Sequence, residues 1–263
     1  MILVHRGLAM DMQRWKDRVA LVTGASSGIG RAVAKELAEG QMRMAICARR
    51  QERLEELRHE LAAKGADVLA VLIDLRDEAQ IERMFDAIRD QWGGVDVLVN
   101  SAAIGYQTSL VNGATDRWRE MWAVNVLALS ICTREAIKDM RRRGDDGHII
   151  HLSSLGAHRQ NPASSGNGMY VATKTAVRVL TEALRRELRA LGSGIRVTAI
   201  SPGLVETEFA LHFLQSEEAA QRVYGRFKVL QPEDIAAIVR YVLSCPLHME
   251  VHDVLVRPTA QET

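Results

Sequence analysis

Cysteine is scarce in this sequence. Among 263 residues there are three, Cys47, Cys132 and Cys245, an odd number at wide spacing. A disulfide framework requires paired cysteines, and a structural zinc site requires four ligands at short, characteristic spacings. We therefore expect neither, and we expect a reducing, cytoplasmic location. His148 and His151 do not suggest a metal site, because residues three apart on a strand point to opposite faces.

An excess of either charge is also missing. Lysine and arginine number 34, and aspartate and glutamate number 33, so the formal net charge is +1. Proteins that bind nucleic acid through its phosphates carry a basic surplus, so the sequence predicts no nucleic-acid partner. A basic run at residues 138–143 falls at the expected end of a helix, where cations interact favourably with the helix dipole. An interaction patch is the alternative.

Long apolar runs are absent as well. No stretch of 18 apolar residues occurs, so no segment is expected to span a membrane. The apolar run within residues 1–7 is too short for a signal peptide. We expect residues 1–14 to form a loose extension in front of a single domain, residues 15–263.

The chain does contain enough apolar residues for a large core, with 47% hydrophobic and 25% charged residues. Short β-branched runs alternate with longer amphipathic segments, which argues for a parallel sheet. The strands lack alternating polarity, which indicates burial on both faces. The sequence therefore predicts an α/β fold with a doubly wound parallel sheet of about seven strands and helices on both faces. Strands are expected at residues 18–23, 42–47, 67–73, 95–99, 148–152, 195–200 and 251–256, and helices at 28–39, 51–64, 77–92, 115–141 and 169–191.

Residues 204–231 depart from this alternation. The segment is too long for a plain connection between elements. It carries apolar residues amid charges: Phe209, Leu211, Phe213, Leu214, Tyr224 and Phe227. We expect a short helical lid over a pocket.

A glycine-rich turn, residues 23–30, follows the first expected strand and opens the first expected helix. In this context Gly24 permits the tight turn, Gly28 permits close approach of the backbone, and Gly30 permits the helix to pack on the strand. Backbone amides at such a turn can hold a pyrophosphate. The turn therefore predicts a dinucleotide site, and a packing role alone is the alternative.

The end of the second strand, Ala48-Arg49-Arg50, carries no acidic residue. Sites that prefer NAD place an acid there to bond the ribose 2′-hydroxyl, whereas arginine can bind a 2′-phosphate. We therefore predict NADPH over NADH; the alternative for both arginines is the start of a solvated helix. Asp74 ends the third strand and is expected to bond the adenine or a nearby amide, or to serve the helix N-terminus. Small residues at 100–103 permit a cofactor to lie against the backbone, or simply make a tight strand exit.

Tyr170 and Lys174 are four residues apart on an expected helix, which places them on one face. A free tyrosine has a pKa of about 10, and a nearby ammonium and a nicotinamide cation both favour its phenolate. Lys174 can also bond the nicotinamide ribose. Ser154, just past the fifth strand, is placed to hold a substrate oxygen, with Ser153 as its competitor. The pattern predicts hydride transfer between a nicotinamide and a carbonyl or alcohol, with Tyr170 as acid or base.

Asn125 is a polar residue within the apolar run 121–129. A buried amide needs hydrogen-bond partners. It could hold a water molecule that links Lys174 to solvent, or it could be a core asparagine satisfied by backbone groups.

Residues 23–30 and 100–103, Asn125, Ser154, the Tyr170–Lys174 pair and Pro202-Gly203 fall in the order of the classical short-chain dehydrogenases/reductases, which the chain resembles over about residues 16–258. The resemblance implies a single Rossmann-like catalytic domain that forms homodimers or homotetramers through helices 115–141 and 169–191. It implies a catalytic tetrad of Asn125, Ser154, Tyr170 and Lys174. The expected cofactor-binding residues are Gly24, Ser26, Ser27, Gly28, Ile29, Gly30, Arg49, Arg50, Asp74, Leu75, Asn100, Ala102, Tyr170, Lys174, Pro202, Gly203, Val205 and Thr207.

Residues 124–135, 145–150 and 257–259 resemble the dehydrogenase/reductase family member eleven group in particular. That resemblance implies NADPH-dependent reduction of ketosteroids and other bulky carbonyls. The alternative is a dehydrogenase of small 3-hydroxy acids or serine, which a cationic lid residue (Arg222, Arg226 or Lys228) would support. A third hypothesis is that the protein binds NADPH without catalysing a reaction, and the complete tetrad argues against it.

The chain also departs from the family pattern. Ser101 and Ala103 replace an amide and a glycine of the family's Asn-Asn-Ala-Gly motif. Ser154 and Tyr170 are 16 residues apart, whereas 13 is commoner. We expect the longer loop, residues 160–168, to reshape one wall of the substrate pocket.

Overall fold

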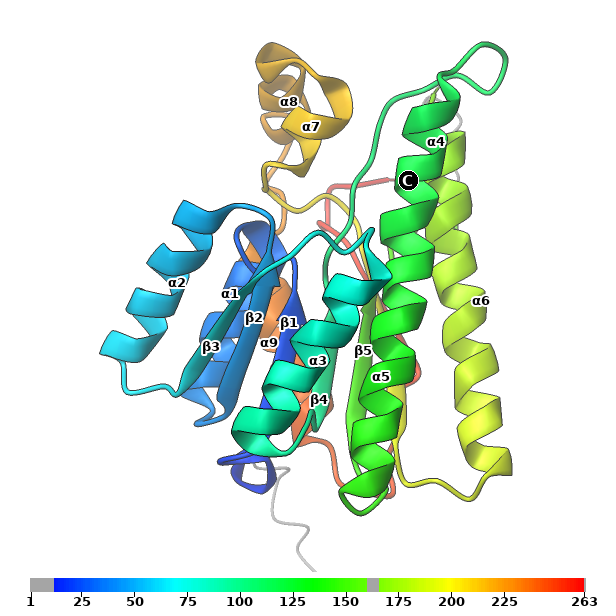
Figure 1. Cartoon of the computed structure of the whole chain (residues 1–263). Helices are drawn as coiled ribbons and strands as arrows, with labels where there is room; N and C mark the ends of the chain where they lie inside the picture. Colours follow the sequence, from blue (N-terminus) through cyan, green and yellow to red (C-terminus); the bar gives the residue numbers. More distant parts are fainter. Residues whose placement is uncertain (1–11, 160–165, 263) are drawn as a thin grey trace, which may run out of the picture.

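A computed structural model of the chain describes residues 12–159 and 166–262 (Figure 1). Most of the expected extension and residues 160–165 of the expected loop therefore lie outside the described residues. The order of strands across the sheet is β3-β2-β1-β4-β5-β6-β7, and every neighbouring pair is parallel. The predicted seven-stranded parallel sheet is thus confirmed. The strands are β1 Val19–Thr23, β2 Arg43–Ala48, β3 Val68–Leu72, β4 Val97–Asn100, β5 His148–Leu152, β6 Arg196–Pro202 and β7 Asp253–Val256.

Helices cover both faces of this sheet, as predicted (Figure 1). One apolar layer joins the sheet to α1, α2 and α9, and the other joins it to α3, α5 and α6. The helices are α1 Gly28–Glu39, α2 Gln51–Ala63, α3 Glu78–Trp92, α4 Thr115–Trp122, α5 Leu129–Arg142, α6 Gly168–Ala190, α7 Phe209–Leu214, α8 Glu217–Tyr224 and α9 Pro232–Ser244.

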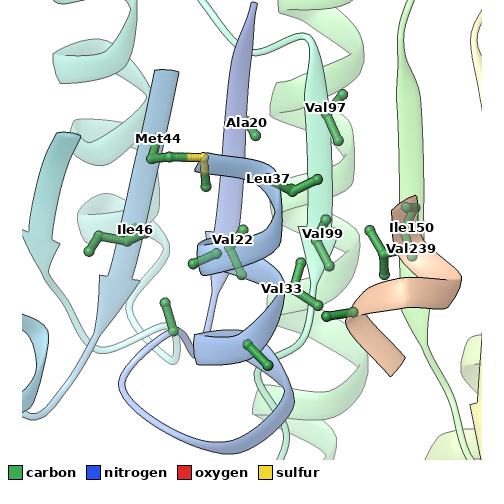
Figure 2. Packing of buried hydrophobic residues seen from close by; sticks show 14 of the residues in the cluster. Ala20, Val22, Val33, Leu37, Met44, Ile46, Val97, Val99, Ile150 and Val239 are labelled. Carbon is green, nitrogen blue, oxygen red and sulfur yellow. The ribbon is translucent and has the colours of Figure 1, made fainter. Parts of the chain in front are cut away.

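Strand β1 shows why its sequence is apolar up to its last residue, Thr23. All five of its residues are buried, and they alternate between the two layers. Ala20 and Val22 face α1 and α9, where Val33 and Leu37 of α1 pack over them, as Figure 2 shows. Val19 and Leu21 belong to the opposite layer. A strand covered on both faces has no solvent side, so polar residues find no favourable position within it.

Two elements differ from the sequence-based expectation. The helix expected over residues 115–141 is interrupted by a π-helical turn, Ala123–Ala128, between α4 and α5. Residues 12–14, expected to belong to a loose extension, instead pack on the domain, since Met12 is buried and residues Gln13–Trp15 form a 3-10 turn. Within that turn Trp15 is fully buried and its indole Nε1 donates to the Leu243 carbonyl at 2.8 Å.

The segment 204–231 holds the short helices α7 and α8. A bridge between Val205 and Leu230 closes its base. Figure 1 shows both helices above the carboxyl ends of the strands, and that this segment serves as a lid stays a prediction.

No helix in the described ranges is long and apolar enough to cross a bilayer. The same residues include no cluster of three or more His, Cys, Asp or Glu placed to hold a metal ion.

Candidate active site

The strand order reverses between β1 and β4, and a cavity of about 1350 Å³ opens near that point. In open parallel sheets such a crevice at the carboxyl ends of the strands is where ligands bind. Most of the predicted site residues line it. They are Gly24, Ser26, Ser27, Gly28, Ile29, Gly30, Arg49, Arg50, Asp74, Leu75, Ala102, Ser154, Tyr170, Lys174, Pro202, Gly203, Val205 and Thr207.

Two predicted residues, Asn100 and Asn125, are not in that lining and are almost fully buried. The Asn100 amide Nδ2 donates to Thr133 Oγ1 at 3.0 Å. The Asn125 side chain accepts from the Ile104 amide at 2.9 Å and donates to the Ile104 carbonyl at 2.8 Å and to Thr173 Oγ1 at 3.0 Å. These bonds satisfy its amide within the protein, which was the structural alternative for this residue.

The glycine-rich turn fits a phosphate group. Gly24 has φ +68°, and a Cβ there would lie 2.7 Å from the Ala102 Cα. A Cβ on Gly30 would clash with the Gly24 carbonyl oxygen. Ser27, the N-cap of α1, makes no side-chain capping bond, and the first turn of α1 contains no acidic residue. The first amides of α1 are thus accessible to an anion, and the local charge does not repel it.

Gly30→Ala should therefore weaken both folding and NADPH binding. The added methyl has no room against a backbone carbonyl, so we expect a loss of about 1–3 kcal/mol in the free energy of unfolding. We also expect NADPH affinity to fall at least tenfold, measured by fluorescence titration on the folded fraction. Gly225→Ala is the matched control, because its φ of −80° suits alanine and its Cβ would lie 3.1 Å from the Gln221 carbonyl oxygen, a tight contact but a milder one than the 2.4 Å at Gly30. Wild-type stability and affinity in Gly30→Ala would contradict the tight packing.

The two arginines after β2 differ in their surroundings. Arg50 Nη2 donates to Ser27 Oγ at 2.6 Å and to Ser26 Oγ at 3.1 Å, and Arg50 Nη1 pairs with Glu208 at 2.7 Å. Arg49 is exposed at the cavity, and it makes no hydrogen bond or ion pair within the described residues. Of the two, Arg49 is therefore the guanidinium that can turn to a 2′-phosphate without breaking an existing contact.

Asp74 is held by Arg76. The two side chains pair at 2.5 Å, and this hydrogen bond is the main reason that the pKa of Asp74 is lowered. The charge of Arg49 lowers it further, which places Arg49 close by. The helix N-terminal role considered for Asp74 belongs instead to Asp77, which caps α3 by accepting from the Gln80 amide.

Tyr170 and Lys174 share one face of α6 and both reach the cavity, as predicted. Lys174 Nζ donates to the Leu152 carbonyl at 2.7 Å, and burial lowers the pKa of this amine to about 8. Burial raises the pKa of Tyr170 to about 12, while a hydrogen bond with Ser154 lowers it in part. The predicted effect of the Lys174 ammonium on the phenol is not among these causes, because the amine turns toward the end of β5.

The two serines after β5 have different hydrogen-bond partners, which distinguishes their roles. Ser153 is buried and its Oγ donates to the Lys174 carbonyl at 3.0 Å, so it ties β5 to α6. Ser154 bonds Tyr170 and accepts from the Gly156 amide at 3.2 Å. Ser154 is thus the hydroxyl that lies beside the phenol.

Thr23 is a site residue that the sequence analysis did not assign individually. Its Oγ1 accepts from the amides of Ser101 and Ala102, each at 3.1 Å. This hydroxyl braces the exit of β4 against β1, in the region where Ser101 lacks the family's amide. The available signal was its position as the single polar residue that ends an apolar strand.

Aromatic rings from the lid lie against the phenol. The rings of Phe209 and Phe213 in α7 lie 5.2 Å and 5.7 Å from the Tyr170 ring, centroid to centroid. Gly105 leaves room for them, since a Cβ there would lie 2.6 Å from Phe209 and 2.8 Å from Phe213. The wall of the cavity next to Tyr170 is therefore aromatic.

Glu208 connects the lid to the arginine segment and was not predicted. It pairs with Arg50 and with Arg53. Burial raises the pKa of Glu208, but the two arginines outweigh it and lower the pKa to about 2. No local pattern in the sequence signals this pair, because Arg50 and Glu208 are 158 residues apart.

Comparisons with known proteins agree with this geometry. Residues 18–218 match the family model of short chain dehydrogenases. The chain is 49% identical to dehydrogenase/reductase SDR family member 11 of Bos taurus, over 96% of this chain and 100% of that protein. It is 39% identical to farnesol dehydrogenase of Aedes aegypti, over 95% and 100%.

Solved structures show the same fold with a nicotinamide cofactor. The closed form of serine dehydrogenase complexed with NADP+ superposes with a TM-score of 0.86 at 31% identity, covering 93% of this chain and 96% of that one. L-sorbose reductase from Gluconobacter frateurii, complexed with NADPH and L-sorbose, gives 0.84 at 28% identity, covering 96% and 99%. The predicted NADP(H) cofactor agrees with these neighbours. Fold, site and sequence together show that the chain belongs to the short-chain dehydrogenase family.

Proposed function

We propose that this protein is an NADPH-dependent oxidoreductase that reduces bulky, apolar ketones to alcohols. The observation that carries the proposal is the aromatic wall formed by Phe209 and Phe213 beside Tyr170. Such rings contribute contact area and favourable ring geometry to an apolar ligand, and they offer neither a counter-charge nor a strong hydrogen bond to the carboxylate of a small acid. The names of two relatives support the same direction, since one is a farnesol dehydrogenase and another a dehydrogenase/reductase.

The cavity can hold NADPH with residues already described. The turn of Gly24, Gly28 and Gly30 would hold the pyrophosphate, and Arg49 the 2′-phosphate. The other predicted contacts remain proposals of the same kind: Ser26, Ser27, Ile29, Arg50, Asp74, Leu75 and Ala102 on the adenosine side, and Pro202, Gly203, Val205 and Thr207 on the nicotinamide side. Asn100 would act indirectly, through its bond to Thr133.

The reaction assigns each polar residue a step. NADPH, held by the glycine-rich turn and Arg49, would supply the hydride to the carbonyl carbon. Tyr170 supplies the proton to the carbonyl oxygen, and its raised pKa keeps the phenol protonated and able to donate. Ser154 holds the same oxygen as its charge develops. Lys174, with a pKa of about 8, can exchange a proton near neutral pH and so return one to the tyrosine from solvent.

Asn125 would support this proton relay by holding the residues of the relay in place. Its amide bonds fix the exit of β4 to α6, the helix that carries Tyr170 and Lys174. It lies in the π-helical turn, where the regular backbone bonding of the helix is altered. A backbone carbonyl in such a turn can hold the water molecule that the sequence analysis expected Asn125 to hold.

Oxidation of serine or a small 3-hydroxy acid is the second candidate. It is favoured by Arg226, which lines the cavity from the lid and could pair with a carboxylate. The similarity to serine dehydrogenase points the same way. Arg222 and Lys228 are not in the cavity lining. Oxidation of a small acid is the weaker candidate, because only Arg226 of the lid favours it, whereas the rings of both Phe209 and Phe213 lie against Tyr170.

Substrate trials can separate the two. We expect NADPH consumption with ketosteroids and other bulky ketones, and little reaction with NADH. NADP+-dependent oxidation of serine or 3-hydroxy acids without ketone reduction would overturn the proposal in favour of the second candidate.

Phe213→Ala should lower kcat/KM for a bulky apolar ketone by about 10–100-fold, because the aromatic contact and apolar burial of one phenylalanine are lost. The effect on a small ketone should be much weaker. Arg226→Gln is the matched lid control: it should leave ketone reduction unchanged. If Arg226→Gln instead abolished turnover and Phe213→Ala did not, the substrate would be anionic.

We also propose that the chain forms a homodimer or homotetramer. Apolar side chains are exposed on the outer face of α4, the π-helical turn and α6: Trp122, Leu127, Val179 and Leu180. Large apolar side chains that stay exposed on neighbouring helices are candidates for an interface with another chain. The cytoplasmic location and the lack of a nucleic-acid partner stay predictions from the sequence.

A further inference from the structure

We infer that the end of the sheet opposite the cofactor cavity contains a buried site for a small monovalent anion, held by Arg196 and Arg14. Figure 1 shows the N-terminal turn at this end, far from the lid. The inference does not depend on the proposed reaction. It rests on buried donor atoms that have no acceptor within the described part of the chain.

Arg196, the first residue of β6, provides the central observation. The residue is 2% exposed. Its Nη1 donates to the carbonyls of Cys245, Pro246 and Met249, at 3.2, 3.4 and 3.0 Å, which fastens the loop after α9 to the sheet. Its Nε and Nη2 are buried and unbonded. These two nitrogens form the two-pronged edge of a guanidinium that normally binds a carboxylate or another anion.

Arg14 supplies a further donor. Its Nη2 pairs with Asp146 at 2.9 Å and its guanidinium stacks on Trp15, 4.4 Å from the ring centroid. The remaining Nη1 is buried and without an acceptor. Arg14 and Arg196 are close enough for the charge of one to act on the other: burial first and the charge of Arg14 next lower the pKa of Arg196. Arg196 is thus a buried cation and Arg14 a partly exposed one, at 24% side-chain exposure, and an anion between or beside them would relieve their repulsion.

The surrounding charges do not supply it. Arg18 and Arg143 join the cluster through Asp96, and Arg18 also pairs with Asp146. Glu250 is the remaining acid that acts on Arg196, and one of its oxygens accepts from the Val197 amide. Among the described residues, four arginines thus face three carboxylates, and one positive charge is left over. Buried donors and buried charges without partners are costly, so an occupant that supplies both would stabilise the fold.

His148 limits where the ion lies. It neighbours Arg196 in the β5–β6 register, and its Nδ1 is also buried without a partner. Thr198 Oγ1 donates to the Val251 carbonyl, so it accepts from His148 Nε2. Burial lowers the pKa of His148 well below its usual value, so the ring is neutral and Nδ1 is an acceptor. We therefore assign the anion to the arginine nitrogens and not to the imidazole.

Thermal unfolding of the full chain tests the site. Melting curves are recorded in sodium chloride, formate and gluconate at equal sodium concentrations. We expect chloride or formate to raise Tm by about 5 °C, and the rise to level off once the site is full. Gluconate should not raise Tm, because the buried donor atoms leave no room for so large an ion. A response to chloride alone identifies a halide site, and a response to formate alone identifies an oxyanion site. Identical curves in all three salts would overturn the inference and leave a buried water molecule as the occupant.

Variants and diffraction give independent readouts. Arg196→Gln should abolish the anion-specific shift, whereas Arg119→Gln, which alters an exposed ion pair with Asp116, should keep it. If Arg196→Gln fails to fold, Arg14→Gln removes one of the three donors and should weaken the dependence at least threefold. Crystals of the unmodified protein soaked in bromide should show an anomalous peak against Arg196 Nε and Nη2. Its absence there, with density that refines as water, would refute the site.

Discussion

Tyr170→Phe should lower kcat for ketone reduction by about 10²–10⁴-fold, the usual contribution of a positioned general acid. Tyr170 reaches the cavity beside Ser154, and burial raises its pKa to about 12, so a protonated phenol is available for the role of proton donor in the proposed reduction. Phenylalanine keeps the ring contacts with Phe209 and Phe213 and removes only the hydroxyl. We therefore expect NADPH affinity, measured by fluorescence titration, to stay within about threefold of the wild type.

Tyr241→Phe is the matched control. Tyr241 lies in α9, is 42% exposed and does not line the cavity. Its loss of a hydroxyl should leave kcat and NADPH binding unchanged. If Tyr170→Phe retained kcat within a factor of ten, another group would have to deliver the proton. If Tyr170→Phe lost NADPH binding together with turnover, the main role of Tyr170 would be to bind the cofactor.

Arg49→Asp should lower kcat/KM for NADPH by about 100-fold and improve the use of NADH. In the proposed site the substitution would remove a charge-assisted hydrogen bond to the 2′-phosphate, which contributes about 1.5–3 kcal/mol, and would add a repelling carboxylate. The same carboxylate can accept from the 2′-hydroxyl of NADH. The informative measurement is the ratio of kcat/KM for the two cofactors, because it cancels general damage to the enzyme.

Arg49 is a cleaner target than Arg50. Replacing Arg50 would also release Ser26, Ser27 and Glu208, and so disturb the glycine-rich turn and the lid together. Arg83→Asp, on the exposed face of α3, is the charge-matched control and should leave the ratio unchanged. An unaltered ratio in Arg49→Asp would show that the 2′-phosphate is bound elsewhere.

Much of the site could be predicted because it depends on local patterns. The glycines that must make a tight turn, the four-residue spacing of Tyr170 and Lys174, and the serines after the fifth strand are all set within a few residues of sequence. Parallel strands bring their carboxyl ends to one edge of the sheet, so residues that follow successive strands meet there whatever their separation in the chain. The family resemblance added the order of these motifs and the roles that they carry.

The sequence could not predict which of two similar, neighbouring residues takes a given role, because the answer depends on hydrogen-bond partners that the fold supplies. Ser154 and not Ser153 lies beside the phenol, since Ser153 is taken by the Lys174 carbonyl. Asp77 and not Asp74 caps α3, since Arg76 holds Asp74. These pairs look alike in sequence, and hydrogen-bond geometry alone separates them.

The sequence by itself determined the class of this protein: a parallel sheet from buried β-branched strands, a dinucleotide turn from its glycines, and a tyrosine–lysine pair from helical spacing. These features follow from backbone geometry and apolar burial, which act over a few residues. Only the tertiary structure decided which arginine stays available at the cofactor end, how Glu208 joins the lid to Arg50, and that Arg196 has a buried donor edge without an acceptor. Charges and hydrogen bonds act between whichever groups the fold brings within a few ångströms, and the sequence order does not record that proximity.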